Sequence, residues 1–199
     1  MIYETAYIVR RSATAEEAQT LKEKVLEIIN AAGGEALVND DWGMRTFAQA
    51  GKKGETAGHY FYIMYQCAGS INDEIERRLK LSETVLKWLV IKLGSDSEKE
   101  KIMKAYKNPN HQGDEEQLND KDKRLTSKKR SCWFSEHKTS PDWKNPNSYK
   151  WLVNEFGKIS PARVTSLRPR FQRQATTAIK RGRNMGLISH ISNATSQKI

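Results

Sequence analysis

The sequence predicts an α+β protein. A βαββαβ domain is expected over residues 1–94 and a small, mostly helical, basic module over residues 128–199, joined by a polar flexible linker over residues 95–127. Two observations predict this division: strand-type and helix-type hydrophobic patterns alternate in the first half, and the positive charge gathers in the last third. A chain of 199 residues can form one ordinary domain or two small ones, so these patterns decide between them.

The first half reads as a strand, a capped helix and then further alternating elements. Residues 2–10 are strand-like, and Thr14 followed by Glu17 forms a capping-box pattern that begins a helix, which Gly33-Gly34 ends. Two strands, a helix and a β-branched final strand are expected next, at residues 35–49, 59–67, 70–81 and 85–93. This order is that of a ferredoxin-like domain.

The second half is more polar and less regular. Between residues 95 and 127 the hydrophobic periodicity fades, so burial cannot offset the entropy of ordering, although a short helix near residues 98–106 fits the pattern. Asn147 is expected to cap a helix that ends at Gly157, and Pro169 to begin another that ends near Gly186.

The charge distribution indicates an anionic partner for the last third. Residues 128–199 carry 15 Lys/Arg against 3 Asp/Glu, a net charge of +12, whereas residues 1–94 and 95–127 each have a net charge of −1. A basic surface raises the local concentration of polyanions. By charge alone, nucleic acid and acidic membrane both remain open.

The helix expected after Pro169 has two different faces. One face carries Arg170, Arg173, Thr177, Lys180 and Arg181, and the other carries Phe171, Ala175, Ala178, Ile179 and Met185. A plain solvated face normally mixes charge signs, yet residues 157–199 contain no Asp or Glu. Guanidinium groups donate paired hydrogen bonds to phosphate and stack on bases, so the arginine-rich face predicts RNA binding.

The sequence predicts neither an enzyme nor a metal or cofactor site. Cys67 and Cys132 form no C-x-x-C or Cys/His cluster, and the four histidines are scattered without a nucleophile or paired carboxylate beside them. There is no signal-peptide pattern and no apolar run of about 20 residues that would span a membrane. A reduced, cytoplasmic location is expected.

Several blocks in the last third resemble the small-subunit ribosomal protein eighteen family across residues 128–192. The blocks are Cys132-Trp133-Phe134, Gly157-Lys158-Ile159-Ser160-Pro161-Ala162-Arg163-Val164-Thr165, Gln172-Arg173-Gln174 and Ala178-Ile179-Lys180-Arg181-Gly182-Arg183. The pattern departs from the family at four positions, where Cys, Arg, Gly and Ala are usual: Ser135, Ala162, Ser166 and Gly182. The missing cysteine removes the expectation of zinc.

Residues 1–94 resemble the small-subunit ribosomal protein six family. The resemblance lies in Tyr3-Glu4 with Ile8-Val9, Trp42-Gly43-Met44-Arg45, Gly58-His59-Tyr60-Phe61 and Arg78-Leu79-Lys80-Leu81-Ser82-Glu83-Thr84-Val85-Leu86. That family has the same βαββαβ order, and its members pair with the eighteen family on ribosomal RNA in the platform of the small subunit. The resemblance therefore implies a structural, non-enzymatic ribosomal component whose two modules dock on each other as a tethered pair, with ribosomal RNA and neighbouring small-subunit proteins as partners.

These considerations give two sets of candidate residues. RNA contacts are expected from Lys158, Arg163, Arg168, Arg170, Arg173, Lys180, Arg181 and Arg183, and from Arg45, Lys52 and Lys53, for which plain surface solubility is the alternative. Packing between the modules is expected from Trp133, Phe134, Trp151, Phe156, Phe171 and Ile179. The competing hypothesis is a free-standing RNA-binding regulator that stacks bases on Tyr60, Phe61 and Tyr62 of the N-terminal sheet.

Overall fold

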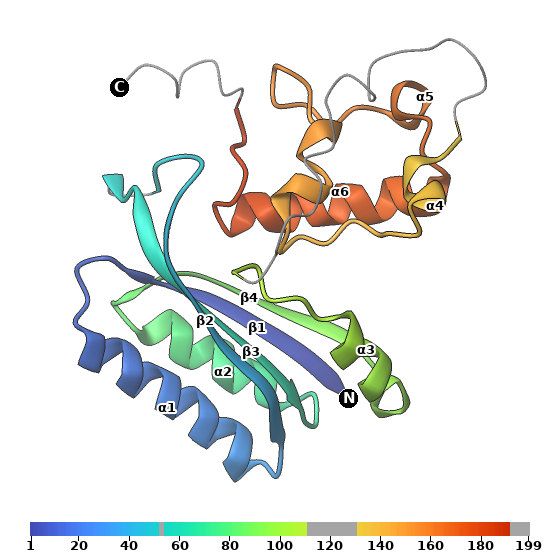
Figure 1. The fold of residues 1–199 in the computed structure, drawn as a ribbon. Helices are drawn as coiled ribbons and strands as arrows, with labels where there is room; N and C mark the ends of the chain where they lie inside the picture. The colour runs from blue at the N-terminus through green and yellow to red at the C-terminus, as the bar shows by residue number, and fades with distance from the viewer. Residues whose placement is uncertain (52–53, 111–130, 192–199) are drawn as a thin grey trace. The chain divides into compact units, whose positions relative to one another are not determined.

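A computed structural model describes residues 1–51, 54–110 and 131–191 of the chain. The chain divides into two compact units, an N-terminal unit over residues 1–110 and a C-terminal unit over residues 111–199, and each is described by itself. The N-terminal unit contains the sheet and two long helices, and the C-terminal unit is helical (Figure 1).

The N-terminal unit is a four-stranded antiparallel sheet with both long helices on one face (Figure 1). Its strands lie in the order β2-β3-β1-β4, with β1 antiparallel to both β3 and β4. The elements are β1 (Ile2–Arg10), α1 (Ala15–Ala31), β2 (Glu35–Thr46), β3 (Ala57–Gln66), α2 (Ile71–Leu81) and β4 (Val85–Gly94). The predicted ferredoxin-like βαββαβ domain is confirmed.

The predicted capping box begins α1. The Thr14 hydroxyl accepts the Glu17 N–H, and the Glu17 carboxylate accepts the Thr14 N–H. Alternate residues of β1 and β3 then face the two helices, because side chains alternate along a strand. The resulting core contains Tyr3, Tyr7, Val9, Val25, Ile29, Phe61, Ile63, Tyr65, Ile75 and Leu79, all buried.

Residues 95–110 differ from the flexible linker that the sequence predicts. They form a short turn (Asp96–Glu98) and helix α3 (Lys99–Ala105), then continue along the sheet as part of the N-terminal unit. We call residues 95–110 the strap. The Tyr106 ring stacks on Tyr62 with 4.9 Å between centroids, and Trp42 also stacks on Tyr62, at 5.1 Å. The Tyr106 ring thus anchors a mostly polar segment to the sheet.

Polar contacts fix the strap to strand β2. The Tyr106 hydroxyl donates to Asp40 at 2.5 Å, and the Asn108 amide donates to the same Asp40 oxygen at 2.9 Å. At the start of α3, Lys99 pairs with Glu35 at 2.7 Å, and at the end of the strap Asn110 accepts from Arg45 at 2.6 Å. Burial and the hydrogen bond to Asp40 both raise the pKa of Tyr106, so its hydroxyl stays protonated as a donor.

Truncating Tyr106 is expected to release the strap. Tyr106→Ala should lower the free energy of opening residues 96–108 by about 2 kcal/mol, because a half-buried stacked ring and its hydroxyl bond are both lost. Hydrogen exchange followed by mass spectrometry measures this opening. Met103→Ala, on an exposed position of α3, is the matched control and should leave protection unchanged. Equal protection in Tyr106→Ala and wild type would contradict the role given to the ring.

The C-terminal unit is built from one long helix and several short ones. They are α4 (Trp133–Glu136), two 3-10 turns (Pro146–Ser148 and Lys150–Leu152), α5 (Ala162–Thr165) and α6 (Pro169–Asn184). The predicted helix after Pro169 is confirmed, with Pro169 in its first turn. Within the described part of the chain, no helix has the length and apolar character needed to cross a membrane.

The helix predicted from Asn147 to Gly157 is wrong. Asn145, two residues earlier, provides the cap by accepting the Asn147 N–H, and Pro146 begins a single 3-10 turn. A second turn follows, and Val153 then pairs antiparallel with Ile159, which removes that stretch from any helix. The chain therefore reverses direction within residues 154–158.

Tyr149 and Gly182 approach each other too closely to admit a side chain at residue 182. The Tyr149 hydroxyl donates to the Trp143 carbonyl at 2.9 Å, and a Cβ added at Gly182 would lie only 2.3 Å from that hydroxyl oxygen. This contact gives a physical reason for glycine at a position where the related family usually has alanine. It also joins α6 to the turns that precede it.

Gly182→Ala is expected to destabilise the C-terminal unit by about 1 to 3 kcal/mol through overpacking, although alanine normally stabilises a helix relative to glycine. Tyr149→Phe removes the clashing oxygen, so the double variant should be more stable than the sum of the two single changes. Urea unfolding of all four proteins gives this coupling energy. Strictly additive effects would show that the hydroxyl is not the obstacle.

Candidate nucleic-acid interface

Helix α6 separates its charged and apolar residues cleanly. Arg170, Arg173, Thr177 and Lys180 are exposed, and Arg181 is half-buried. On the opposite side Ala175, Ala178, Ile179 and Met185 are buried, and the half-buried Phe171 ring stacks on Phe134 at 5.6 Å. We call Arg170, Arg173, Lys180 and Arg181 the basic face. Its placement follows the helical periodicity of the sequence.

The loop before α6 is fixed by one glutamine of the helix. The Gln172 amide nitrogen donates to the Ser160 carbonyl at 2.9 Å, and its oxygen accepts from the Thr165 hydroxyl at 3.0 Å. Gln172 thereby clamps both sides of the turn that carries Arg163. Arg163, within this clamped turn, and Lys158, which precedes it, are both exposed. The sequence marked Gln172 only as part of a family block and gave no sign of this contact.

The start of α6 is held by Cys132. The Arg168 N–H donates to the Cys132 sulfur at 3.4 Å, and the Arg168 side chain is exposed. Burial raises the pKa of the Cys132 thiol, but hydrogen bonds from the backbone of Arg168 and from Ser135 outweigh it, so the net pKa is lowered. The cysteine thus positions the helix that carries the basic face.

Among the described residues, the cations predicted in the C-terminal unit have no carboxylate partner. Across residues 131–191, Asp142 pairs with Lys144 at 3.2 Å and Glu136 accepts from the Ser131 hydroxyl. No ion pair among the described residues involves the basic face, Lys158, Arg163 or Arg168. Their positive potential therefore remains available to a polyanion.

Arg183 differs from the other predicted RNA contacts. Its guanidinium donates to the Gly157 carbonyl, and its Nε is buried. Gly157 itself has a left-handed φ of +75°, and a Cβ there would lie 2.7 Å from the His190 carbonyl oxygen. Arg183 thus holds the turn at residues 154–158 against the end of α6.

Of the three cations predicted in the N-terminal unit, the structure describes only one. Arg45 is half-buried, lies 5.6 Å above the Trp42 ring and donates to Asn110 of the strap. Burial lowers the pKa of this guanidinium. Arg45 therefore joins strand β2 to the strap. Lys52 and Lys53 lie outside the described residues.

Several of the residues predicted to pack between modules contact one another within the C-terminal unit. Phe134 and Ile179 are fully buried, and Trp133 meets Phe134 and Trp151 edge-on at 5.0 and 5.7 Å. We call Trp133, Phe134, Trp151 and Phe171 the aromatic cluster; Phe171 is the member that α6 contributes. Phe156 is different, because 75% of it is exposed.

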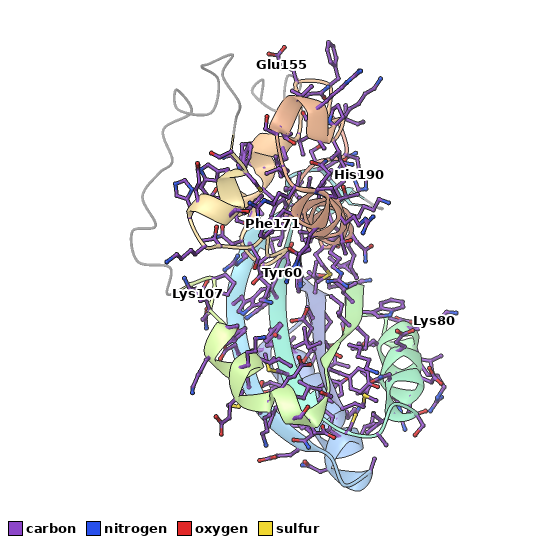
Figure 2. The ribbon with its side chains drawn as sticks, turned by 90° about the vertical axis from the view of Figure 1, so that its right-hand side faces the viewer. Tyr60, Lys80, Lys107, Glu155, Phe171 and His190 are labelled. Atoms are coloured by element: carbon purple, nitrogen blue, oxygen red, sulfur yellow. The ribbon has the colours of Figure 1, made fainter. Side chains whose placement is uncertain are left out.

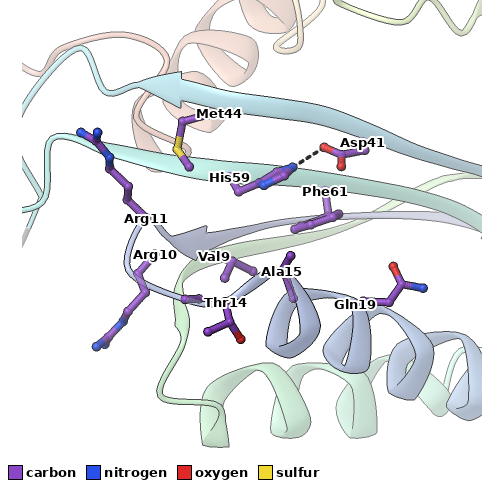
Figure 3. Close-up of a pocket in the computed structure, with 12 residues that line it drawn as sticks. Val9, Arg10, Arg11, Thr14, Ala15, Gln19, Asp41, Met44, His59 and Phe61 are labelled. Carbon is purple, nitrogen blue, oxygen red and sulfur yellow. Dashed lines mark hydrogen bonds and ion pairs between the residues drawn. The ribbon is translucent and has the colours of Figure 1, made fainter.

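A cavity of about 330 Å³ lies in the N-terminal unit beside the start of α1. Its most polar feature is the pair of His59 and Asp41 at 2.5 Å, with the imidazole stacked on Phe61 (Figure 3). Arg10 and Arg11 line the cavity but diverge from each other (Figure 3). These side chains do not converge on one ligand atom, so the cavity offers no constellation for catalysis.

Comparisons with known proteins match both halves of the chain. Residues 2–92 match the family model described as ribosomal protein S6, and residues 137–188 match that of ribosomal protein S18. The small ribosomal subunit protein bS6 of Rickettsia felis is 30% identical over 110 residues, which is 54% of this chain and 89% of the relative. The bS6 protein of a Sulfurovum species is 34% identical over 96 residues, 48% and 75% of the two chains.

A crystal structure of 30S ribosomal protein S6 from Thermotoga maritima aligns with 52% of this chain and 96% of that chain, at 28% identity and a TM-score of 0.46.

Together with the sheet and the basic helical unit, the matches define a structural, non-enzymatic protein of the small ribosomal subunit. The chain belongs to the ribosomal protein S6 family through residues 2–92, and the S18 match makes it a fusion of parts of two ribosomal families. The predicted resemblance to both families is confirmed. The S18 match begins at residue 137, after the block Cys132-Trp133-Phe134.

Proposed function

We propose that this chain binds small-subunit ribosomal RNA in the platform through the basic face, with Lys158, Arg163 and Arg168 extending the contact. The observation that carries the proposal is a helix face rich in arginine in a segment, residues 157–199, that contains no acidic residue. Each guanidinium can take two phosphate oxygens at once, and its plane can stack on an exposed base. A folded RNA presents both kinds of group.

We further propose that the two units dock on each other as a covalently tethered pair in the cytoplasmic ribosome, beside neighbouring small-subunit proteins. Tethering favours this arrangement, because a short linker gives two modules an effective concentration in the millimolar range. The nearly neutral N-terminal unit then acts as a scaffold, and the C-terminal unit supplies most of the positive charge.

The competing hypothesis of a regulator that stacks bases on the N-terminal sheet is disfavoured by the strap. Tyr62 would have to offer its ring to a base, yet it lies against both Trp42 and Tyr106 and is fully buried. Its hydroxyl donates to the buried Glu4 carboxylate at 2.7 Å. Phe61 faces the helices and stacks on Tyr7 at 5.3 Å.

Sedimentation of a lysate through a sucrose gradient tests the proposal. The chain should travel with the small subunit, and chemical footprinting of small-subunit RNA should show protection in the platform. A chain absent from small-subunit fractions would falsify assembly into the ribosome. Protection confined to another part of the RNA would contradict only the proposed location in the platform.

A further inference from the structure

The turn at residues 154–158 is closed by several hydrogen bonds. The Asn154 N–H donates to the Lys158 carbonyl at 2.8 Å, and the Gly157 N–H donates back to the Asn154 carbonyl at 2.9 Å. The Asn154 side-chain oxygen also accepts from the N–H groups of Phe156 at 3.1 Å and Lys158 at 2.7 Å. Such a turn has a fixed backbone conformation.

The turn is also anchored to the rest of the C-terminal unit. The Val153–Ile159 pair closes its base, and Arg183 of α6 holds the Gly157 carbonyl. Gly157 lies so close to the His190 backbone that a larger residue would not fit. The position of residue 156 is therefore set by the fold.

This rigid turn presents an aromatic ring to solvent. Phe156 is 75% exposed, the highest fraction among the exposed large apolar side chains of the described residues. Its neighbours Glu155 and Lys158 are also exposed, and Glu155 lies at the tip of the unit, pointing outward (Figure 2). The residues beside it along the turn, Asn154, Glu155 and Lys158, are polar or charged and exposed, unlike the apolar centre of a typical protein interface. A single ring beside a cation suits a nucleotide better.

We propose that Phe156 stacks on an unpaired base of ribosomal RNA while Lys158 contacts an adjacent phosphate. The inference rests on the proposed function and extends it, because the basic face accounts for phosphate contacts and this turn adds contact with a base. The charge of the region agrees with this, since every ionisable side chain of Lys, Arg, Asp or Glu after Glu155 is basic. Stacking tolerates any base, because each base has a flat π-face.

Binding of the full chain to an in vitro transcript of bacterial small-subunit ribosomal RNA tests the inference over a range of KCl concentrations. Phe156→Ala should weaken binding about five- to a hundredfold. It should leave the slope of log K against log salt unchanged, because no phosphate contact is lost. Phe156→Tyr should restore binding to within about twofold, whereas Lys158→Ala should reduce the slope by about 0.7 to 0.9.

Leu81→Ala is the matched control, because Leu81 is 66% exposed and lies in the N-terminal unit, and it should bind as wild type. The Phe156→Ala variant should unfold at the same temperature as the wild-type chain, because the ring is exposed. Wild-type affinity in Phe156→Ala, or a changed salt slope, would overturn the stacking inference alone. Failure of the wild-type chain to bind the transcript would overturn the proposed function, and this inference with it.

Discussion

Binding of small-subunit ribosomal RNA is expected to fall at least about a hundredfold when Arg173 and Arg181 are both changed to alanine. Both belong to the basic face, and no described carboxylate pairs with either. A charge-assisted hydrogen bond contributes roughly 1.5 to 3 kcal/mol, so losing two gives this factor or more. If each arginine neutralises one phosphate, the slope of log K against log salt should also fall by about 1.4 to 1.8.

A matched pair of arginines in the N-terminal unit controls for the change in net charge. Arg77 and Arg78 both pair with Glu74 on α2, at 2.7 and 3.0 Å. Changing them to alanine removes the same two charges and should leave RNA affinity within about threefold, because long-range charge effects are screened by salt. Equal losses in the two double variants would mean that net charge, and not the basic face, determines binding.

The second large effect is expected from Phe134→Ala, which should cost the C-terminal unit about 3 to 5 kcal/mol. Phe134 is fully buried and contacts Trp133, Trp151 and Phe171, so its removal leaves a cavity in the middle of the aromatic cluster. A unit of roughly 60 described residues has a stability of only about 3 to 9 kcal/mol. The variant should therefore lose from about a third to all of this stability.

Near-ultraviolet circular dichroism and urea unfolding measure this loss. His137→Ala is the control, because His137 stacks on Trp133 at 4.3 Å but is exposed, and it should change stability by less than about 1 kcal/mol. Phe134→Ala should also lose RNA binding, since the basic face depends on α6 being packed. A stable variant with an unchanged aromatic signal would show that the cluster is dispensable.

Much of the fold follows from local signals. The Thr14 capping box, the alternation of the strands and the apolar side of α6 depend on residues close together in sequence, and all three appear in the structure. The short helix near residues 98–106 was anticipated, but the attachment of the strap to the sheet was not, because Tyr106 is fixed by Asp40 and Tyr62, which lie in distant strands. The helix expected after Asn147 failed because Asn145 and Pro146 form a shorter turn, and because Val153 pairs with Ile159.

The residues of the candidate interface also fall into those that local sequence predicts and those that depend on distant contacts. Exposure of Arg170, Arg173 and Lys180 follows from helical periodicity. The inward contact of Arg183 with Gly157, and that of Arg45 with Asn110, depend on segments that come together only in the folded chain. The exposure of the Phe156 ring also could not be predicted from local sequence, because a phenylalanine near tryptophans is expected to be a core residue.

The close approach of Tyr149 and Gly182 has a consequence for how this chain can evolve. Alanine at residue 182 packs without a clash only when the residue at 149 lacks the phenolic oxygen, so the two positions form an epistatic pair. Loss of the tyrosine hydroxyl first is the favoured order, because the reverse order passes through an overpacked and less stable intermediate. In related chains, the residue at position 149 should therefore covary with that at 182, with tyrosine accompanying glycine.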